Sequence, residues 1–275
     1  MGEIITEQDR RYEREESASA PRDDQPMSDR VNNRSLRPNS RVFKEFMTTG
    51  WDNNEPAVQP LPSSGYTPAR LRKLGSRFPG ERLVIPAGQP KVRNNDCDYA
   101  FRPDSAFTYY TGLGQDYEAG AVLVLNPLDP DDPRAAAGET HVPELFVAPR
   151  ADNSTEDYYR DAHYGEYWVG PRAGLKELAT MTGIETHDIA QLADSVGKDV
   201  GAEAGSVRVR VIPGTDESVS SMVESLREAN GFPDRRDNTD HDNRFHEFAS
   251  EQRMVKDDFE VREIRRAVDA TKDGF

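Results

Sequence analysis

Short runs of aliphatic and aromatic residues alternate with amphipathic stretches along most of this chain, which indicates interleaved strands and helices. Strands are predicted where apolar residues run together or alternate with polar ones, at 83–85, 107–110, 121–125, 145–147 and 207–211. Helices are predicted where apolar residues recur every three or four positions, at 172–181, 184–196, 219–229, 244–255 and 257–271. This order of elements predicts an α/β fold.

Several residues mark where these elements begin and end. Thr67 followed by Pro68 predicts a helix start, with Thr67 as the N-cap. Asp257 and Glu260 have the spacing of a capping box, with Asp in the Ser/Thr position. The polar and acidic stretch 232–243 predicts a loop. The run 121–125 is almost continuously aliphatic, as expected for a strand that is covered on both faces.

The composition changes along the chain and predicts three regions. Residues 1–40 are rich in charged residues and poor in large apolar ones, so we expect a disordered tail. Residues 41–65 predict a short docking helix followed by a proline-rich linker. The globular part is predicted to start at about residue 66.

Charge and cysteine content narrow the possible functions. The net charge of −15 argues against binding of nucleic acids or of anionic membranes, because both need basic surface. The sequence has no apolar run long enough to cross a bilayer and no apolar core of a usual signal peptide. The single cysteine, Cys97, excludes an internal disulfide and fits a reducing cytoplasm. Asp96 and Asp98 flank it and disfavour a reactive thiolate.

The densest group of histidines and carboxylates contains Asp240, His241, Asp242, His246 and Glu247. Such side chains suit a divalent metal, but nothing in the sequence fixes a ligand geometry, and a solvated acidic loop is the alternative. Phosphate-loop, dinucleotide-binding and Gly-x-Ser-x-Gly motifs are absent from the sequence.

A second polar group lies between two aromatic stretches and contains Arg102, Asp104 and Ser105. These residues could contact a peptide, or they could cap a strand and a turn, and we favour the structural role. The neighbouring rings, which include Tyr109, are more typical of a core or an interface than of a binding stack.

Three stretches resemble, in the same order, the aminopeptidase P family of Xaa-Pro aminopeptidases. The first precedes and includes the aliphatic run 121–125 and contains Asp96, Tyr99, Phe101, Arg102, Ser105, Phe107, Tyr109, Thr111, Gly112 and Glu118. The second has the pattern Trp-x-Gly-x-Arg-x-Gly at Trp168, Gly170, Arg172 and Gly174. The third resembles the segment that opens the family's catalytic domain and contains Glu260, Val261, Ile264, Arg265 and Ala267. Together the resemblance covers about residues 66–275. It implies that residues 66–243 are the N-terminal domain of the family and that residues 244–275 are a connecting helix and the start of the catalytic domain.

This resemblance implies a mixed sheet with flanking helices, like the N-terminal domain of the family. In the family a separate catalytic domain, of pita-bread fold, holds two metal ions, usually manganese, and releases the first residue of peptides that have proline second. Its two Asp, one His and two Glu ligands would lie beyond Phe275, so no catalytic or metal-binding residue is assigned in this sequence.

The resemblance also implies what these 275 residues do. The N-terminal domain of such enzymes covers the mouth of the active site, limits peptide size and contributes to oligomer contacts, so a homo-oligomer is expected. We assign Arg102, Asp104, Tyr109, Trp168 and Arg172 as the candidate substrate-gating residues. The chain is expected to stop before the catalytic domain and to be inactive alone. The alternative function is a non-catalytic protein-interaction module.

Overall fold

The computed structural model describes residues 45–47, 49, 57–94, 98–115, 117–129, 131–151, 153, 155–161, 164–203 and 205–275. The chain divides into two compact units. The larger unit consists of Pro56–Pro149 and Ala173–Phe275, and the smaller one is assigned Met1–Glu55 and Arg150–Arg172. The predicted tail 1–40 and the surroundings of Cys97 lie outside the described residues, and the segment 41–65 is described only in part.

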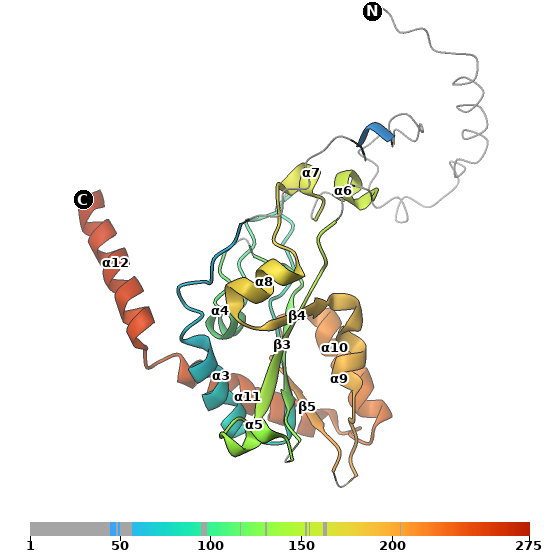
Figure 1. Cartoon of the computed structure of the whole chain (residues 1–275). Helices are drawn as coiled ribbons and strands as arrows, with labels where there is room; N and C mark the ends of the chain where they lie inside the picture. Colours follow the sequence, from blue (N-terminus) through green and yellow to red (C-terminus); the bar gives the residue numbers. More distant parts are fainter. Residues whose placement is uncertain are drawn as a thin grey trace, which may run out of the picture. The chain divides into compact units, whose positions relative to one another are not determined.

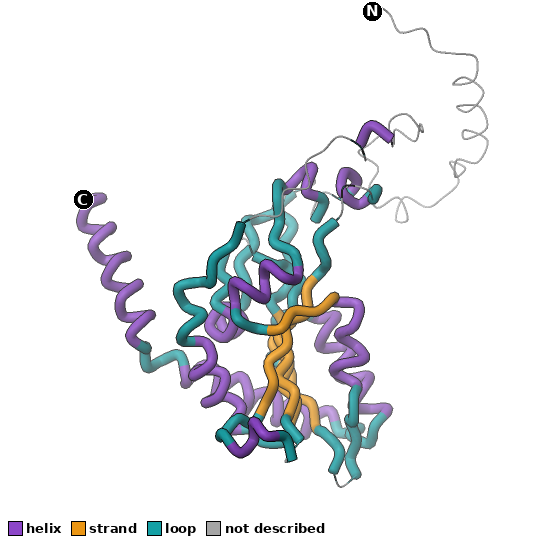
Figure 2. The backbone as a smooth tube through the Cα atoms, viewed as in Figure 1, coloured by secondary structure: helices purple, strands orange, loops and turns teal. Residues whose placement is uncertain are grey.

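A five-stranded mixed sheet forms the centre of the larger unit, in the order β4-β3-β2-β1-β5 (Figures 1 and 2). The strands are β1 (Glu81–Pro86), β2 (Val122–Pro127), β3 (His141–Val147), β4 (Glu185–Asp188) and β5 (Arg208–Val211). The pairs β1–β2 and β2–β3 are antiparallel, whereas β1–β5 and β3–β4 are parallel. This arrangement confirms the predicted α/β class with a mixed sheet.

Helices cover both faces of the sheet. The larger unit contains α3 (Thr67–Arg77), α4 (Ser105–Thr111), α5 (Pro133–Ala136), α8 (Leu175–Thr182), the 3₁₀ turn η2 (Ile189–Gln191), α9 (Leu192–Gly197), α10 (Glu217–Ala229), α11 (Arg235–Gln252) and α12 (Asp258–Gly274). The smaller unit contains α6 (Asp157–Arg160) and α7 (Glu166–Val169). The figures show the helices of the larger unit on either side of its strands.

Alternation along the strands separates two hydrophobic clusters. Leu83 and Leu123 belong to the cluster that also contains buried residues of α3, α4, α8 and α11. Val84 and Val124 point to the opposite face and pack with residues of α9 and α10. Strand β2 is therefore covered on both faces, as its aliphatic sequence predicts.

The segment 107–110, which we expected to be a strand, is helical. Asp104 is the N-cap of α4, and its side chain accepts a hydrogen bond from the backbone N–H of Ala106 at 2.7 Å. Gly112 ends the helix in the left-handed region, with φ of 80°. These two caps outweigh the strand propensity of the aromatic residues. The helix buries Phe107 and Tyr110, which are three positions apart on one face.

Other boundaries also differ from the prediction. The predicted helix 184–196 is divided into strand β4, the turn η2 and helix α9. Asp188 produces the division, because its side chain accepts from the N–H of Ala190 at 2.9 Å and starts a new helical segment. Tyr66, not Thr67, is the N-cap of α3. The capping box of Asp257 and Glu260 is confirmed at the start of α12.

Helix α11 occupies most of the stretch predicted as a loop at 232–243. Asp234 caps it by accepting from the N–H groups of Arg236 and Asp237. Its inward positions in the first three turns include Asn238 and Asp242, which are buried although they are polar. A search for apolar periodicity misses such a helix because hydrogen bonds, and not apolar contacts, hold this part of its inner face.

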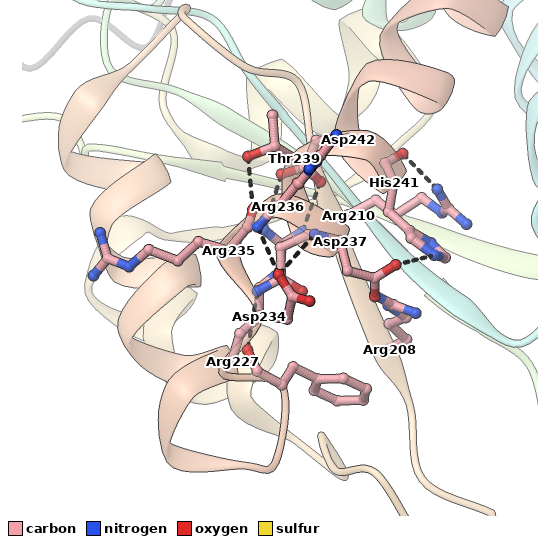
Figure 3. Close-up of polar contacts among 12 residues, drawn as sticks. Arg208, Arg210, Arg227, Asp234, Arg235, Arg236, Asp237, Thr239, His241 and Asp242 are labelled. Atoms are coloured by element: carbon pink, nitrogen blue, oxygen red, sulfur yellow. Dashed lines mark hydrogen bonds and ion pairs between the residues drawn. The ribbon is translucent and has the colours of Figure 1, made fainter.

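A buried ion pair fixes α11 to the rest of the unit (Figure 3). The guanidinium of Arg227 donates to both carboxylate oxygens of Asp242, at 2.6 and 2.8 Å. The two side chains are only 3% and 9% exposed. Arg227 also donates to the carbonyl of Val209, and Asp242 accepts from the N–H of Val211 at 3.0 Å. The pair thus connects α10, α11 and β5.

We predict that Asp242→Asn destabilises the chain by roughly 3–5 kcal/mol, because it leaves the buried Arg227 charge with only its longer contact to Glu224, at 3.4 Å. Urea unfolding followed by circular dichroism measures this change. The control is Glu263→Gln on α12, which breaks an exposed pair with Arg266 and should cost under about 1 kcal/mol. Equal losses in the two variants would contradict the structural role of the Arg227–Asp242 pair.

His141, at the start of β3, is buried, and its hydrogen bonds fix one tautomer of the imidazole. Its Nε2 lies 2.7 Å from the carbonyl oxygen of Glu81, which can only accept, so Nε2 carries the proton. Its Nδ1, 2.9 Å from the hydroxyl of Thr140, is then the acceptor. Burial lowers the pKa of His141 below its ordinary 6.5, which favours this neutral form.

We predict that His141 makes the fold sensitive to mild acid. A histidine whose pKa is lowered by folding contributes stability that is present above the unfolded-state pKa of about 6.5 and is lost as the pH falls below it. The unfolding free energy of the unmodified chain should therefore drop more steeply between about pH 6.5 and 5 than that of His141→Gln. His246→Gln, at an exposed position of α11, is the control and should keep the steep dependence.

Candidate functional site

The candidate residues Arg102 and Asp104 lie at the start of α4 but have different surroundings. Asp104 is a helix cap, and its backbone N–H donates to the carbonyl of Ala87 at 2.9 Å. Arg102 is exposed and makes no hydrogen bond or ion pair within the described residues. Of these two side chains, only that of Arg102 is open to a ligand.

Tyr109 is buried against Arg70, a residue that the sequence patterns did not single out. The guanidinium carbon of Arg70 lies 4.2 Å from the centre of the Tyr109 ring. Arg70 also donates to the backbone carbonyl of Tyr109 at 2.8 Å. Burial raises the pKa of the Tyr109 phenol, which keeps it protonated. This environment suits a packing role better than general-base chemistry.

Arg70 is the centre of a junction between α3, α4 and the start of α12. It forms an ion pair with Asp257 at 2.7 Å, and its own side chain is 6% exposed. Although burial acts in the opposite direction, hydrogen bonds from the Glu260 N–H and from Arg70 lower the pKa of Asp257. Asp257 is therefore a charged cap for α12 and, at the same time, the counter-ion of Arg70.

Gln252, the last residue of α11, completes this junction. Its amide donates to the carbonyl of Arg70 at 2.9 Å, and its oxygen accepts from the hydroxyl of Tyr110 at 3.1 Å. The one sign of this junction in the sequence is Arg70, a charged residue on an otherwise apolar helix face. Its partners are 39 and 187 positions away, so no local pattern identifies them.

Trp168 and Arg172 belong to the smaller unit. The indole of Trp168 is 60% exposed, and its Nε1 donates to the carbonyl of Tyr159 at 2.7 Å. Arg172, which we expected at a helix start, precedes α8 by three positions, and its guanidinium lies 4.9 Å from the centre of the Tyr164 ring. Its N–H donates to Glu166 at 2.8 Å. Trp168 thus presents a fixed aromatic surface.

The histidine and carboxylate side chains of α11 do not converge into a metal site. Asp242 is occupied by Arg227, while the nearest acidic oxygen to His241 is that of Asp237, at 3.6 Å. Among the described residues no three His, Cys, Asp or Glu side chains are grouped so that they could hold a metal ion. The described residues therefore do not fit the pair of metal ions that the family resemblance implies. In that same part of the chain, no helix is both long and apolar enough to cross a membrane.

Comparison with known families and proteins gives a consistent result. The family model described as aminopeptidase P, N-terminal domain, matches residues 68–207. Xaa-Pro aminopeptidase 1 of Streptomyces coelicolor is 34% identical over 237 residues, which is 86% of this chain and 42% of that protein. Xaa-Pro aminopeptidase 2 of the same organism is 33% identical over 251 residues, or 90% of this chain and 47% of that protein.

Among solved structures, aminopeptidase P from Escherichia coli has a TM-score of 0.47 and 22% identity, with 64% of this chain and 34% of that one covered. The chain therefore spans less than half the length of the Streptomyces relatives. The matched family model lies within the stretch that forms the mixed sheet and its helices. The chain belongs to the aminopeptidase P family, through the N-terminal domain of that family.

Proposed function

We propose that this protein takes part in Xaa-Pro aminopeptidase activity, the release of the first residue from peptides with proline second. The match of residues 68–207 to the aminopeptidase P N-terminal domain carries this proposal. The names of the Streptomyces relatives, Xaa-Pro aminopeptidases 1 and 2, support the substrate class.

Within that activity, we assign these 275 residues to substrate gating and assembly. Residues 66–243 act as the N-terminal domain, and residues 244–275 connect it to a catalytic domain that supplies the ligands for two manganese ions. We also propose a cytoplasmic protein that acts as a homo-oligomer.

We propose different roles for the candidate substrate-gating residues. Arg102 and the exposed ring of Trp168 are available to contact a peptide, and Arg172 supports the segment that carries Trp168. Tyr109 and Asp104 hold α4 in place and act on the gate through it.

A non-catalytic interaction module is the second candidate, and helix α12 favours it. No residue of this helix is buried, and Ile264 and Val268 are 50% and 49% exposed on one side. Such a stripe suits a protein partner, which would be either the catalytic domain or another chain.

We predict that the purified 275-residue polypeptide does not hydrolyse chromogenic Xaa-Pro peptides, with or without added manganese. The reason is that its described residues contain no convergent set of metal ligands. A fusion of this chain to the catalytic remainder of the Streptomyces coelicolor Xaa-Pro aminopeptidase 1 should hydrolyse them.

Within that fusion, Trp168→Ala should change the ratio of kcat/KM for long and short peptides, while Tyr167→Ala, at a neighbouring exposed ring, is the control. Manganese-dependent turnover by the 275 residues alone would overturn the gating assignment. A folded fusion that binds manganese and cleaves no Xaa-Pro peptide would overturn the proposed activity.

We predict that α12 is the helix with the fastest hydrogen exchange beyond its first turn. Its first turn is anchored through Asp257 to Arg70 and through Phe259, whose ring centre lies 5.5 Å from that of Tyr66. In the second turn Arg262 donates to the hydroxyl of Tyr66 at 3.0 Å, and no residue of the helix is buried. An isolated helix of about 15 residues is marginal in water. Exchange of residues 259–271 in a dilute monomer measures this, with α10 as the internal reference. Protection equal to that of α10 would show that the chain itself covers the stripe and would weaken the second candidate function.

A further inference from the structure

A polar groove of about 460 Å³ lies between the end of α3 and helix α11. Its walls come from three places that are distant in the sequence: residues 77–79, the paired strands β1 and β5, and one side of α11. Arg244, Glu247 and Glu251 follow one another at intervals of three and four along α11, so they lie on the same side of that helix. The groove is distinct from the candidate gate residues, none of which lines it.

The bottom of the groove is aromatic and fixed. Phe78 packs edge-on against Phe245 and Phe248, with ring centres 5.5 and 5.8 Å apart. The guanidinium of Arg210 lies 4.8 Å from the centre of the Phe78 ring. Arg210 is itself fully engaged, because it pairs with Glu81 and donates to the carbonyl of His241. The Arg210–Glu81 pair therefore adds no net charge. The half-buried Phe248 offers an apolar surface to a ligand, whereas Phe78 is only 6% exposed and supports that ring.

Four further side chains around the groove keep their charges available. Within the described residues Arg77, Arg244, Glu247 and Glu251 form no ion pair or side-chain hydrogen bond, although all four line one groove. The guanidinium of Arg77 lies 5.7 Å from the centre of the Phe78 ring. The charge of Arg244 also acts at longer range on Asp237, whose carboxylate is already bonded to Arg208. The groove thus presents separate positive and negative groups above an apolar floor.

We propose that this groove binds a short peptide with both termini free. The peptide carboxylate pairs with Arg77 and Arg244, its ammonium group pairs with Glu251, and an apolar side chain rests on Phe248. Arg244 and Glu251 are seven positions apart, which is about 10 Å along a helix. An extended tripeptide has about the same length.

The test is a calorimetric titration of the 275-residue chain with the tripeptide Ala-Leu-Ala, which has no proline in second place. We expect saturable binding, with a dissociation constant on the order of millimolar for so few contacts. Arg244→Gln and Glu251→Gln should each raise that constant by about fivefold or more, and so should N-acetylation or C-amidation of the peptide. High salt should also weaken binding, since the charges are exposed.

Matched controls are Arg236→Gln and Asp240→Asn, which remove charges from α11 at exposed positions outside the groove. Both should leave the dissociation constant within about twofold. Equal binding of the free and the capped peptides would overturn the proposal, as would a control variant that weakens binding as much as Arg244→Gln. If amidation of the peptide weakened binding and acetylation did not, the groove would bind an anion only. That result would also overturn the proposal of a peptide site. This inference does not rest on the proposed function, because binding is measured without turnover.

Discussion

The pairing of Arg227 with Asp242 is the contact on which the arrangement of the larger unit depends. It removes two opposite charges from water almost completely and holds the first half of α11 against β5. Removing two charges from water is costly, and only a pair with its remaining bonds satisfied offsets that cost. Here the backbone of Val209 and Val211 and the carboxylate of Glu224 supply further bonds, while the buried Nε of Arg227 has no partner among the described residues. The pair therefore fixes not only the position of α11 but also its rotation about its own axis.

The rotation of α11 determines what the rest of that helix can do. With Asp242 directed inward, Phe245 and Ala249 enter the hydrophobic cluster, and Gln252 reaches Arg70 and Tyr110. On a neighbouring side the charged residues Arg244, Glu247 and Glu251 face the groove. A rotation of one residue, about 100°, would remove both arrangements together. The core contacts of α11, its junction with α12 and the groove therefore all depend on this one orientation of α11.

The sequence was informative where apolar contacts decide the structure, and for polar contacts only where they are local, as in the capping box of Asp257 and Glu260. Strands β1, β2 and β3 were predictable because they are aliphatic runs, and the mixed sheet followed from the family resemblance. Helix α11 was not, because Asn238 and Asp242 occupy inward positions that a pattern of hydrophobicity assigns to a loop. Helix α4 was missed because its two caps, Asp104 and Gly112, outweigh the strand preference of its rings.

The candidate site shows the same limit. Its residues near α4 and α7 were named from a family pattern, and that pattern does not say which side chains are exposed. Arg70 and Gln252, which connect α3, α4 and α11 with the start of α12, meet partners that lie far away in the sequence. Their contacts hold the capped first turn of α12 on Arg70. The larger unit thereby sets the direction in which α12 leaves it, although no local pattern in the sequence shows this contact.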